Sequence, residues 1–246
     1  MKIRKDLISN FFSEVFNRNL TRTAPLETQM AFLNSLIPVN NGVELILIGG
    51  HGDGSYLIPN DLKNIEKCIS PGYGGIEKFE SELYSEHKIS SIIIDPDINS
   101  RINNSGAQFI EKFIGARITQ NRITINEIVK ECSQDLILQM DIEGNEYEAL
   151  LGLDLNNLKK FRIIVVELHN LHFISNIWFL NNMLKPAFLD ILQLFDVVMV
   201  RPSSTQTFLI NRMRISDTVE ITFHRKDRAL HMENTSFAWS ELASTF

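Results

Sequence analysis

A short acidic motif follows an apolar run near the middle of the chain. Residues 136–140 are mostly apolar and short enough for a buried strand, which ends on Asp141. Glu143 and Glu146 come next, and after Gly144 the apolar residues fall at helical spacing. Strand, acidic turn and helix form the half-unit of a parallel α/β sheet, in which ligands collect beyond the carboxyl ends of the strands. We therefore expect these carboxylates to line an active site, although the dipole of its own helix explains Glu146 better.

The next predicted strand brings a second set of polar groups to the same edge. Residues 162–167 end on Glu167, and His169 follows. We expect Asp141, Glu167 and His169 to converge in one crevice and to form the catalytic group. Two carboxylates and an imidazole can hold a divalent cation such as Mg²⁺ or Mn²⁺, and His169 alone can act as a general base. A hydrogen-bonded polar group at a strand-to-helix turn is the simpler role for His172, and the competing role for His169.

A glycine-rich turn supplies the candidate cofactor-binding residues. The strand predicted over 65–70 leads to Gly72, Tyr73, Gly74 and Gly75, and the strand predicted over 91–94 leads to Asp95, 23 positions after Gly72. Glycines let a cofactor lie against bare backbone, and an acid in this place accepts hydrogen bonds from a ribose diol. NAD and S-adenosylmethionine both carry such a ribose. Glu77 stands where a dinucleotide motif has its third glycine, which favours S-adenosylmethionine.

A second glycine-rich stretch lies earlier, between the strand-like residues 43–48 and 56–59. Four of the six residues 49–54 are glycine. This density permits a tight hairpin or a close approach of the backbone to a ligand, and the local sequence does not choose between them.

From residue 65 onward strands and helices alternate, which predicts an α/β fold. We expect a doubly wound, mostly parallel seven-stranded sheet of the Rossmann-like type, with strands over 65–70, 91–94, 109–114, 136–140, 162–167, 195–200 and 219–223. The irregular segment 201–218 suggests one antiparallel edge strand. The predicted helices include one that begins at a capping box, Thr124 to Glu127, and a long one over 173–194 that Pro186 interrupts.

The chain divides into three segments. Two apolar stripes over 6–37 predict helices, so we interpret residues 1–42 as an N-terminal helical extension packed on the main domain. Residues 43–227 form the Rossmann-like domain, and residues 228–246, which lack a clear pattern, form a C-terminal tail. Trp178 and the Phe-rich helix around it are assigned to the core in preference to a platform for stacking a sugar.

The composition is that of an ordinary folded protein. The chain has 246 residues, 44% of them hydrophobic, and its net charge of −6 argues against a general binder of nucleic acid, which is normally basic. Cys68 and Cys132 lie in apolar patterns without a spacing motif, as reduced core thiols do in cytoplasmic proteins. No run approaches the ~20 apolar residues of a membrane helix, and no signal peptide is evident. We expect a cytoplasmic, soluble protein without membrane or nucleic-acid partners. A homo-oligomer is left open.

These residues together carry a resemblance to a known family. Residues 141–148, Asp-Ile-Glu-Gly-Asn-Glu-Tyr-Glu, resemble the D-V-E-G-A-E-Y-E signature of FkbM-type S-adenosylmethionine-dependent methyltransferases. Residues 124–129 and the pair Asp95-Pro96 are similar to that family's T-L-D-D helix start and acid–proline pair. Residues 52–62 and 219–227 resemble elements of one branch, so the likeness spans roughly residues 43–227. Two positions depart from the branch: Ser55 replaces a glycine, and Arg201-Pro202-Ser203-Ser204 stands where H-P-N-N is frequent.

The resemblance implies methyl transfer from S-adenosylmethionine to a hydroxyl of a sugar or glycosylated metabolite. Asp95 would hold the ribose, and the turn 72–75 would lie under the methionine portion. Asp53, His51 and Asp141 would lie beside the cofactor or the acceptor. Asp141, Glu167 and His169 would remove the proton of the acceptor hydroxyl, directly or with the help of a bound cation.

Two other classes of protein fit the same residues. The first is an NAD-dependent oxidoreductase on a Rossmann fold, which would bind NAD in place of S-adenosylmethionine. The second is a non-catalytic binding domain of the same fold, which would have no turnover to lose when Asp141 or His169 is replaced.

Overall fold

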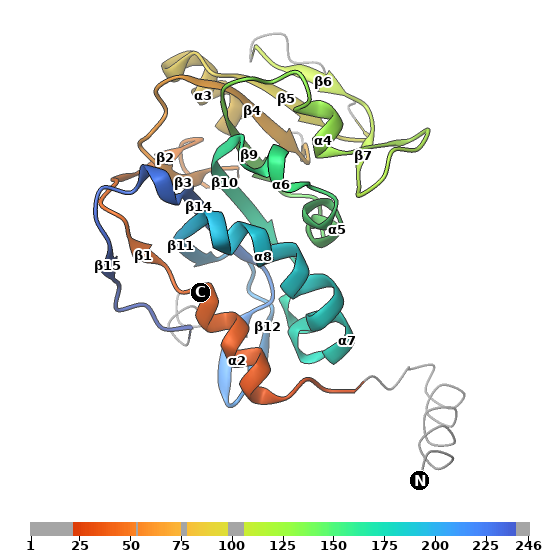
Figure 1. The fold of residues 1–246 in the computed structure, drawn as a ribbon, viewed down its shortest axis with the longest axis vertical. Helices are drawn as coiled ribbons and strands as arrows, with labels where there is room; N and C mark the ends of the chain where they lie inside the picture. The colour runs from red at the N-terminus through yellow and green to blue at the C-terminus, as the bar shows by residue number, and fades with distance from the viewer. Residues whose placement is uncertain (1–21, 53, 75–77, 98–105, 240–246) are drawn as a thin grey trace.

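A computed structural model of the protein describes residues 22–52, 54–74, 78–97 and 106–239. Its centre is a seven-stranded sheet with the order β11-β14-β10-β9-β4-β5-β6 (Figure 1). The strands are β4 (Ile65–Pro71), β5 (Ser90–Ile94), β6 (Gln108–Ile110), β9 (Asp135–Met140), β10 (Phe161–Leu168), β11 (Phe195–Pro202) and β14 (Val219–Arg225). The predicted α/β fold and the mostly parallel seven-stranded sheet are confirmed.

One strand of this sheet runs against the others. Strands β4, β5, β6, β9 and β10 pair in parallel, whereas β14 is antiparallel to both of its neighbours, β10 and β11. The prediction of an antiparallel edge strand is therefore wrong in its position, because β14 lies inside the sheet and β11 forms the edge. The segment predicted as irregular contains a hairpin of β12 (Thr207–Ile210) and β13 (Met213–Ser216). This hairpin reverses the chain, and β14 then lies between β10 and β11, which both precede it in the sequence.

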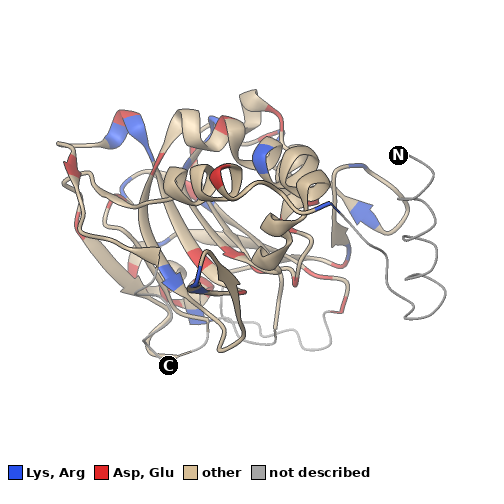
Figure 2. Ribbon diagram, turned by 90° about the horizontal axis from the view of Figure 1, so that it is seen from below, with Lys and Arg blue, Asp and Glu red and all other residues tan. Residues whose placement is uncertain are grey.

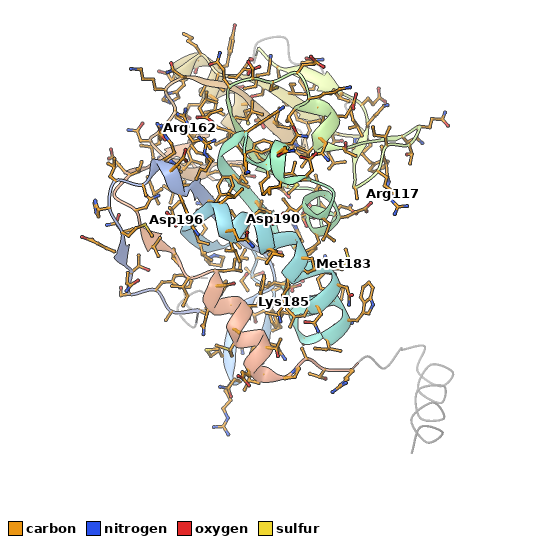
Figure 3. The ribbon with its side chains drawn as sticks, viewed as in Figure 1. Arg117, Arg162, Met183, Lys185, Asp190 and Asp196 are labelled. Atoms are coloured by element: carbon orange, nitrogen blue, oxygen red, sulfur yellow. The ribbon has the colours of Figure 1, made fainter. Side chains whose placement is uncertain are left out.

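Two predicted elements are divided in the structure. Of the strand expected over 109–114, only β6 joins the sheet, and β7 (Phe113–Ile114) pairs with β8 (Arg122–Ile123). The helix expected over 173–194 becomes a 3₁₀ helix (Leu171–Ser175), α7 (Ile177–Phe179), a π-helical turn (Leu180–Leu184) and α8 (Lys185–Leu194). Figure 3 labels Met183 in the π-helical turn and Lys185 at the start of α8. Pro186 lacks an N–H and lies in the first turn of α8, where this loss is tolerated.

The sheet has a hydrophobic cluster on each face, because successive side chains of a strand point to opposite sides. Leu136 and Leu138 belong to the larger cluster with α2 (Leu26–Ser35), α5 (Glu146–Leu151) and α8. Ile137 and Val165 belong to the second cluster, with α3 (Lys78–His87) and the hairpin of β2 (Leu45–Ile48) and β3 (Tyr56–Pro59). The glycine-rich stretch before β3 therefore joins two strands, as one of its two interpretations proposed.

Two short helices, α4 (Ile125–Ile128) and α6 (Leu155–Leu158), directly precede the central strands β9 and β10. The predicted cap of α4 is present, since the Thr124 hydroxyl accepts a hydrogen bond of 3.2 Å from the backbone N–H of Glu127. The other short helix is α6, which Asp154 caps in the same way. Cys68 and Cys132 are buried and unbridged, as predicted for core thiols.

The two ends of the described chain meet on the larger core. Strand β1 (Val39–Asn40) pairs with β15 (Glu233–Asn234), and the indole N–H of Trp239 donates a 2.9 Å hydrogen bond to the carbonyl of Leu33 in α2. Of the helical structure predicted over 6–37, residues 6–21 lie outside the described residues, and α2 accounts for the second apolar stripe. Acidic and basic residues are mixed along the ribbon in Figure 2. Among the described residues, no helix combines the length and the apolar character that crossing a membrane requires.

The assignment of Trp178 to the core is wrong. Its side chain in α7 is 63% exposed, while the apolar neighbours Leu180 and Leu184 of the following turn are buried. Trp178 thus lies on the outer side of a helix whose inner side fills the core, and the spacing of apolar residues alone did not separate the two sides.

Candidate active site

The carboxyl ends of four parallel strands meet at one edge of the sheet. Gly72 follows β4, Asp95 follows β5 and Asp141 follows β9. Glu167 is the second-last residue of β10. In the register between β9 and β10, Met140 is opposite Val166. The next residues along the two strands are Asp141 and Glu167, so parallel pairing brings the two carboxylates side by side.

His169 completes a compact cluster with these two carboxylates. Ligand atoms of Asp141, Glu167 and His169 all lie within 4.8 Å of one another. The Nε2 atom of His169 is 3.9 Å from Oδ1 of Asp141 and 3.8 Å from Oε1 of Glu167. Oδ1 of Asp141 is buried and has no hydrogen-bond partner among the described residues. The structure thus brings together the three residues that sequence spacing selected as catalytic and metal-binding candidates.

Glu146 fixes the orientation of His169. Its side chain is fully buried, and Oε1 accepts hydrogen bonds from the backbone N–H of Ile142 and of Gly144, at 3.2 and 3.0 Å. Nδ1 of His169 lies 3.0 Å from the same oxygen. Because an ionised carboxylate only accepts hydrogen bonds, Nδ1 carries a proton and Nε2 is left to face Asp141 and Glu167.

Burial and the crowding of acids shift the protonation of this cluster. Burial of Asp141, followed by the charges of Glu167, Glu143 and Glu146, raises its pKa to about 7, although His169 acts in the opposite direction. Burial alone would lower the pKa of His169, but the hydrogen bond to Glu146 and the charges of Glu146, Asp141 and Glu143 raise it to about 9. A proton is therefore held within the cluster near neutral pH.

A cavity of about 340 Å³ lies on one side of the cluster. Its wall includes the predicted cofactor residues Gly72, Tyr73, Gly74, Asp95 and Asp141. The carboxylate of Asp95 accepts hydrogen bonds from the backbone N–H of Tyr73, at 2.9 Å, and of Asp97, at 2.8 Å. These contacts hold the acid at the cavity wall. Asp53 and Gly75, the other two predicted cofactor residues, lie outside the described residues.

Gly74 gives this cavity its bare floor. A Cβ atom added at Gly74 would meet no atom within 4 Å, so its backbone faces open space in the cavity wall. Gly72 has a different constraint, since its Cβ atom would lie 1.6 Å from the carbonyl oxygen of Asp141. The residues that could hold a nucleotide cofactor are thus the glycine turn after β4, the carboxylate of Asp95 after β5 and the apolar side chains of the cavity wall. These groups fit S-adenosylmethionine.

A second cavity, of about 440 Å³, includes the other two members of the cluster in its wall. It is lined by Glu143, Glu167, His169, Asn170, Ser203, Ser204, Gln206, Asp217 and Thr218. The hydroxyl of Ser203 donates a 2.8 Å hydrogen bond to Glu167. Glu143 lines both cavities. The cluster therefore contributes Asp141 to a partly apolar cavity and Glu167 and His169 to a strongly polar one.

Several lining residues were not found from the sequence. Lys112, Phe113 and Ile114 line the first cavity, but their stretch was assigned to a strand of the sheet. Phe113 is 49% exposed and lies in the cavity wall. The apolar pattern of a strand did not reveal this position of its aromatic side chain. Glu146 was assigned to its helix dipole, because no spacing rule relates it to a histidine 23 positions away.

Other candidate residues have structural roles. His172 Nδ1 lies 2.7 Å from Asp217, which fits the expected polar group at a turn. His51 is exposed and does not line either cavity as described.

A mostly parallel α/β sheet with a glycine turn after one strand, an acid after the next and a polar cluster at the following strand ends is the arrangement of a Rossmann-like, nucleotide-binding protein. The family model of the methyltransferase FkbM domain matches residues 49–202. The chain belongs to this FkbM methyltransferase family, and the resemblance seen in the sequence is confirmed.

Some solved structures are also similar. A human methyltransferase 10 domain containing protein is 12% identical, with 90% of this chain and 94% of that chain covered and a TM-score of 0.36. The delta-N METTL16 MTase domain is 13% identical, with 89% and 93% covered and a TM-score of 0.32. An antibiotic related methyltransferase is 12% identical, with 74% and 98% covered and a TM-score of 0.30. No curated protein matches the chain.

Proposed function

We propose that this methyltransferase moves a methyl group from S-adenosylmethionine to a hydroxyl of a sugar or glycosylated metabolite. One observation carries the proposal: the cluster contributes Asp141 to one cavity and Glu167 and His169 to another of different character. A donor and an acceptor bound in the two cavities would meet at this cluster. Holding both reactants in place is a large part of what a transferase must do.

The first cavity is the proposed donor site. S-adenosylmethionine supplies a methyl group activated by a sulfonium. Asp95 would accept hydrogen bonds from the ribose diol, and the backbone at Gly72 and Gly74 would lie against the methionine portion. Ile94, Phe113 and Ile114 supply the apolar part of the wall.

The second cavity is the proposed acceptor site. Its amide, hydroxyl and carboxylate groups can pair with several hydroxyls at once, as a sugar requires. Nε2 of His169, once deprotonated, would accept the proton of the reacting hydroxyl, while Glu146 holds the ring through Nδ1. Ser203 and Ser204 stand where the related branch often has two asparagines, so the set of hydroxyls recognised here would differ from that branch.

A divalent cation fits the same cluster. Two carboxylate oxygens and Nε2 of His169 lie within 4.8 Å of one another, and Oδ1 of Asp141 is buried without a partner among the described residues. Glu146 on Nδ1 is the outer carboxylate that orients a ligating histidine. Mg²⁺ or Mn²⁺ bound here would lower the pKa of the acceptor hydroxyl.

The test is incubation of the protein with methyl-labelled S-adenosylmethionine and a panel of free glycosides and nucleotide sugars. We expect label in at least one sugar product, with its methyl group on oxygen. Transfer to no member of the panel, with label found instead on a nitrogen or carbon acceptor, would contradict the assignment of the acceptor. A protein that binds donor but transfers nothing would support the non-catalytic alternative.

A further inference from the structure

A small annex opens beside the proposed donor cavity. It measures about 60 Å³ and is lined by Gly54, Tyr56, Gly72, Gly74, Phe79, Glu80, Gln139 and Asp141. It shares Gly72, Gly74 and Asp141 with the donor cavity. Its volume suits one small polar group and not a ring. We therefore interpret the annex as an extension of the proposed donor cavity beside the glycine turn.

Glu80 is the buried acid of this annex. It lies on α3 on the same side as Phe79 and Leu83, and it is only 5% exposed. An acid on the apolar side of a helix costs folding energy unless its charge is satisfied. The hydroxyl of Ser70 donates a hydrogen bond to Glu80, so at least one polar contact supports the carboxylate.

A chain of hydrogen bonds connects Glu80 to Tyr56. Ser70 Oγ also lies 2.7 Å from the side-chain amide of Gln139, which lies 3.0 Å from the hydroxyl of Tyr56. Nε2 of Gln139 donates to the hydroxyl of Tyr56, and Oε1 of Gln139 faces the Ser70 hydroxyl. Ser70 has a single hydroxyl proton, which lies between oxygens of Glu80 and Gln139. The chain of contacts fixes the position of the Glu80 carboxyl group in the wall of the annex.

The annex attracts a cation. Among the described residues that line it, two are carboxylates and none is Lys, Arg or His. The pKa of Tyr56 is raised well above its usual range by burial and then by the charges of Asp141, Glu167 and Glu220, which agrees with a negative potential at this point. The carboxylate of a ligand placed here would be repelled by Glu80 and Asp141.

We propose that Glu80 binds the α-ammonium group of the methionine portion of the donor. The proposal rests on the proposed use of S-adenosylmethionine and names the group that the annex selects. The ammonium has three N–H donors, and Glu80 with its neighbours Asp141 and Tyr56 offers acceptors around one small space. The carboxylate of the donor would then point away from the annex.

Calorimetric titration with three ligands tests the proposal: S-adenosylhomocysteine, its analogue without the amino group, and its analogue without the carboxylate. We expect loss of the amino group to weaken binding to the wild-type protein by about tenfold or more, the usual effect of one charged hydrogen bond. Loss of the carboxylate should have a smaller effect. This comparison needs no variant, so it holds whether or not a substitution folds.

A variant identifies the residue. With Glu80→Gln, affinity for S-adenosylhomocysteine should fall to that of the amine-free analogue, whose own affinity should change by less than about twofold. Glu86→Gln, on an exposed position of the same helix, is the matched control and should leave all three affinities unchanged. Equal losses for both ligands in Glu80→Gln, or a larger cost for removing the carboxylate in wild type, would overturn the proposal. If wild type binds the homocysteine compound without discriminating the amine, only the annex assignment fails; if it binds none of the three, the proposed donor fails with it.

Discussion

Gly72 and Gly74 lie two positions apart in the turn after β4, yet a side chain would act differently at each. The φ of Gly72 is +97°, and its Cβ atom would lie 1.6 Å from the Asp141 carbonyl oxygen, so any side chain forces β4 and β9 apart. At Gly74 the Cβ atom would meet nothing within 4 Å. One glycine therefore serves the packing of the backbone, and the other leaves room for a ligand.

These two positions give a matched pair of variants. Gly72→Ala should lower the free energy of unfolding by about 4 kcal/mol or more, because it combines a severe clash with an unfavourable φ. Gly74→Ala should keep the free energy of unfolding within about 1 kcal/mol but weaken S-adenosylhomocysteine binding, since its methyl group occupies the donor cavity. Urea unfolding and calorimetry measure the two effects. A stable Gly72→Ala protein, or a Gly74→Ala protein with unchanged affinity, would contradict the assignment.

His169 and Glu146 act as a unit in the proposed reaction. His169→Gln should reduce kcat by roughly 10²–10⁴-fold with little effect on S-adenosylhomocysteine binding, because it removes the group that accepts the proton. Glu146→Gln should lower the pKa of His169, because it removes the charge of Glu146, which helps to raise that pKa, while the amide oxygen keeps the contacts with the backbone N–H groups. Histidine nitrogen shifts in NMR spectra, followed against pH, measure that change. His231→Gln, at an exposed position, is the control, and a kcat unaffected by His169→Gln would argue against the role.

At the residue scale, the polar residues at the strand ends could be predicted from the sequence, whereas the residues that hydrogen-bond to them could not. Asp141 and Glu167 could be predicted because each directly ends an apolar strand. The role of Glu146 could not, because its contact with His169 depends on the turn at Glu143 and Gly144, both with positive φ. Glu80 gave a signal in the sequence, an acid among apolar helix positions, but its meaning required the annex.

At the scale of elements, the insertion of β14 builds the acceptor side. β14 begins at the same sheet edge at which β10 and β11 end, which places Thr218 and Asp217 beside Ser203 and Glu167. β14 is buried on both faces, as β10 is, so its burial does not mark its direction, and the sequence could predict the strand but not its position. The hairpin of β12 and β13 turns at Asn211 and Arg212, which both have positive φ as hairpin turns require, but neither is the glycine that would signal such a turn.

The other end of β14 is held by a buried histidine. His224 lies 2.9 Å from the Asn41 amide and 3.2 Å from the Asp61 carboxylate, with its side chain fully buried. Arg228 and Arg162 also contact Asp61, and Figure 3 labels Arg162. Burial, assisted by these two guanidinium groups, lowers the pKa of His224 below its usual 6.5, despite the opposing effect of Asp61. The folded protein therefore prefers the neutral imidazole.

This preference predicts an acid dependence of stability. Above 6.5 the unfolded and the folded chain both hold neutral His224, so its stabilising contacts are present. As pH falls below 6.5 the unfolded chain binds the proton first, and stability is lost toward the lower folded pKa. The contribution of His224 to the free energy of unfolding should thus decrease from about pH 7 to 5, so the wild type should lose more stability over this range than His224→Gln does. Parallel curves for the two proteins in urea unfolding at several pH values would show that His224 is not responsible.

At the scale of the whole molecule, the proposed transfer uses two cavities and the cluster whose members line them. The family could be predicted from the sequence because residues 141–148 keep the order of a strand end, a turn and a helix start. The exposure of Trp178 and the packing of Trp239 against α2 could not, because both depend on which elements are neighbours in the folded chain. The acceptor cavity likewise draws on β10, the end of β11 and the start of β14, which are distant in the sequence.

The metal proposal has its own test at this scale. Exhaustive chelation should abolish methyl transfer, and Mg²⁺ or Mn²⁺ should restore it, because the cation would supply the lowered pKa of the acceptor hydroxyl. Asp141→Asn should weaken that restoration by removing one charged ligand. Activity that survives chelation would leave His169 as the sole base.

Calorimetric titration of the intact protein with S-adenosylmethionine and, separately, with NAD decides which cofactor the donor cavity holds. We predict saturable binding of one S-adenosylmethionine per chain, weakened by Gly74→Ala, and no binding of NAD. Tight binding of NAD with none of S-adenosylmethionine would contradict it.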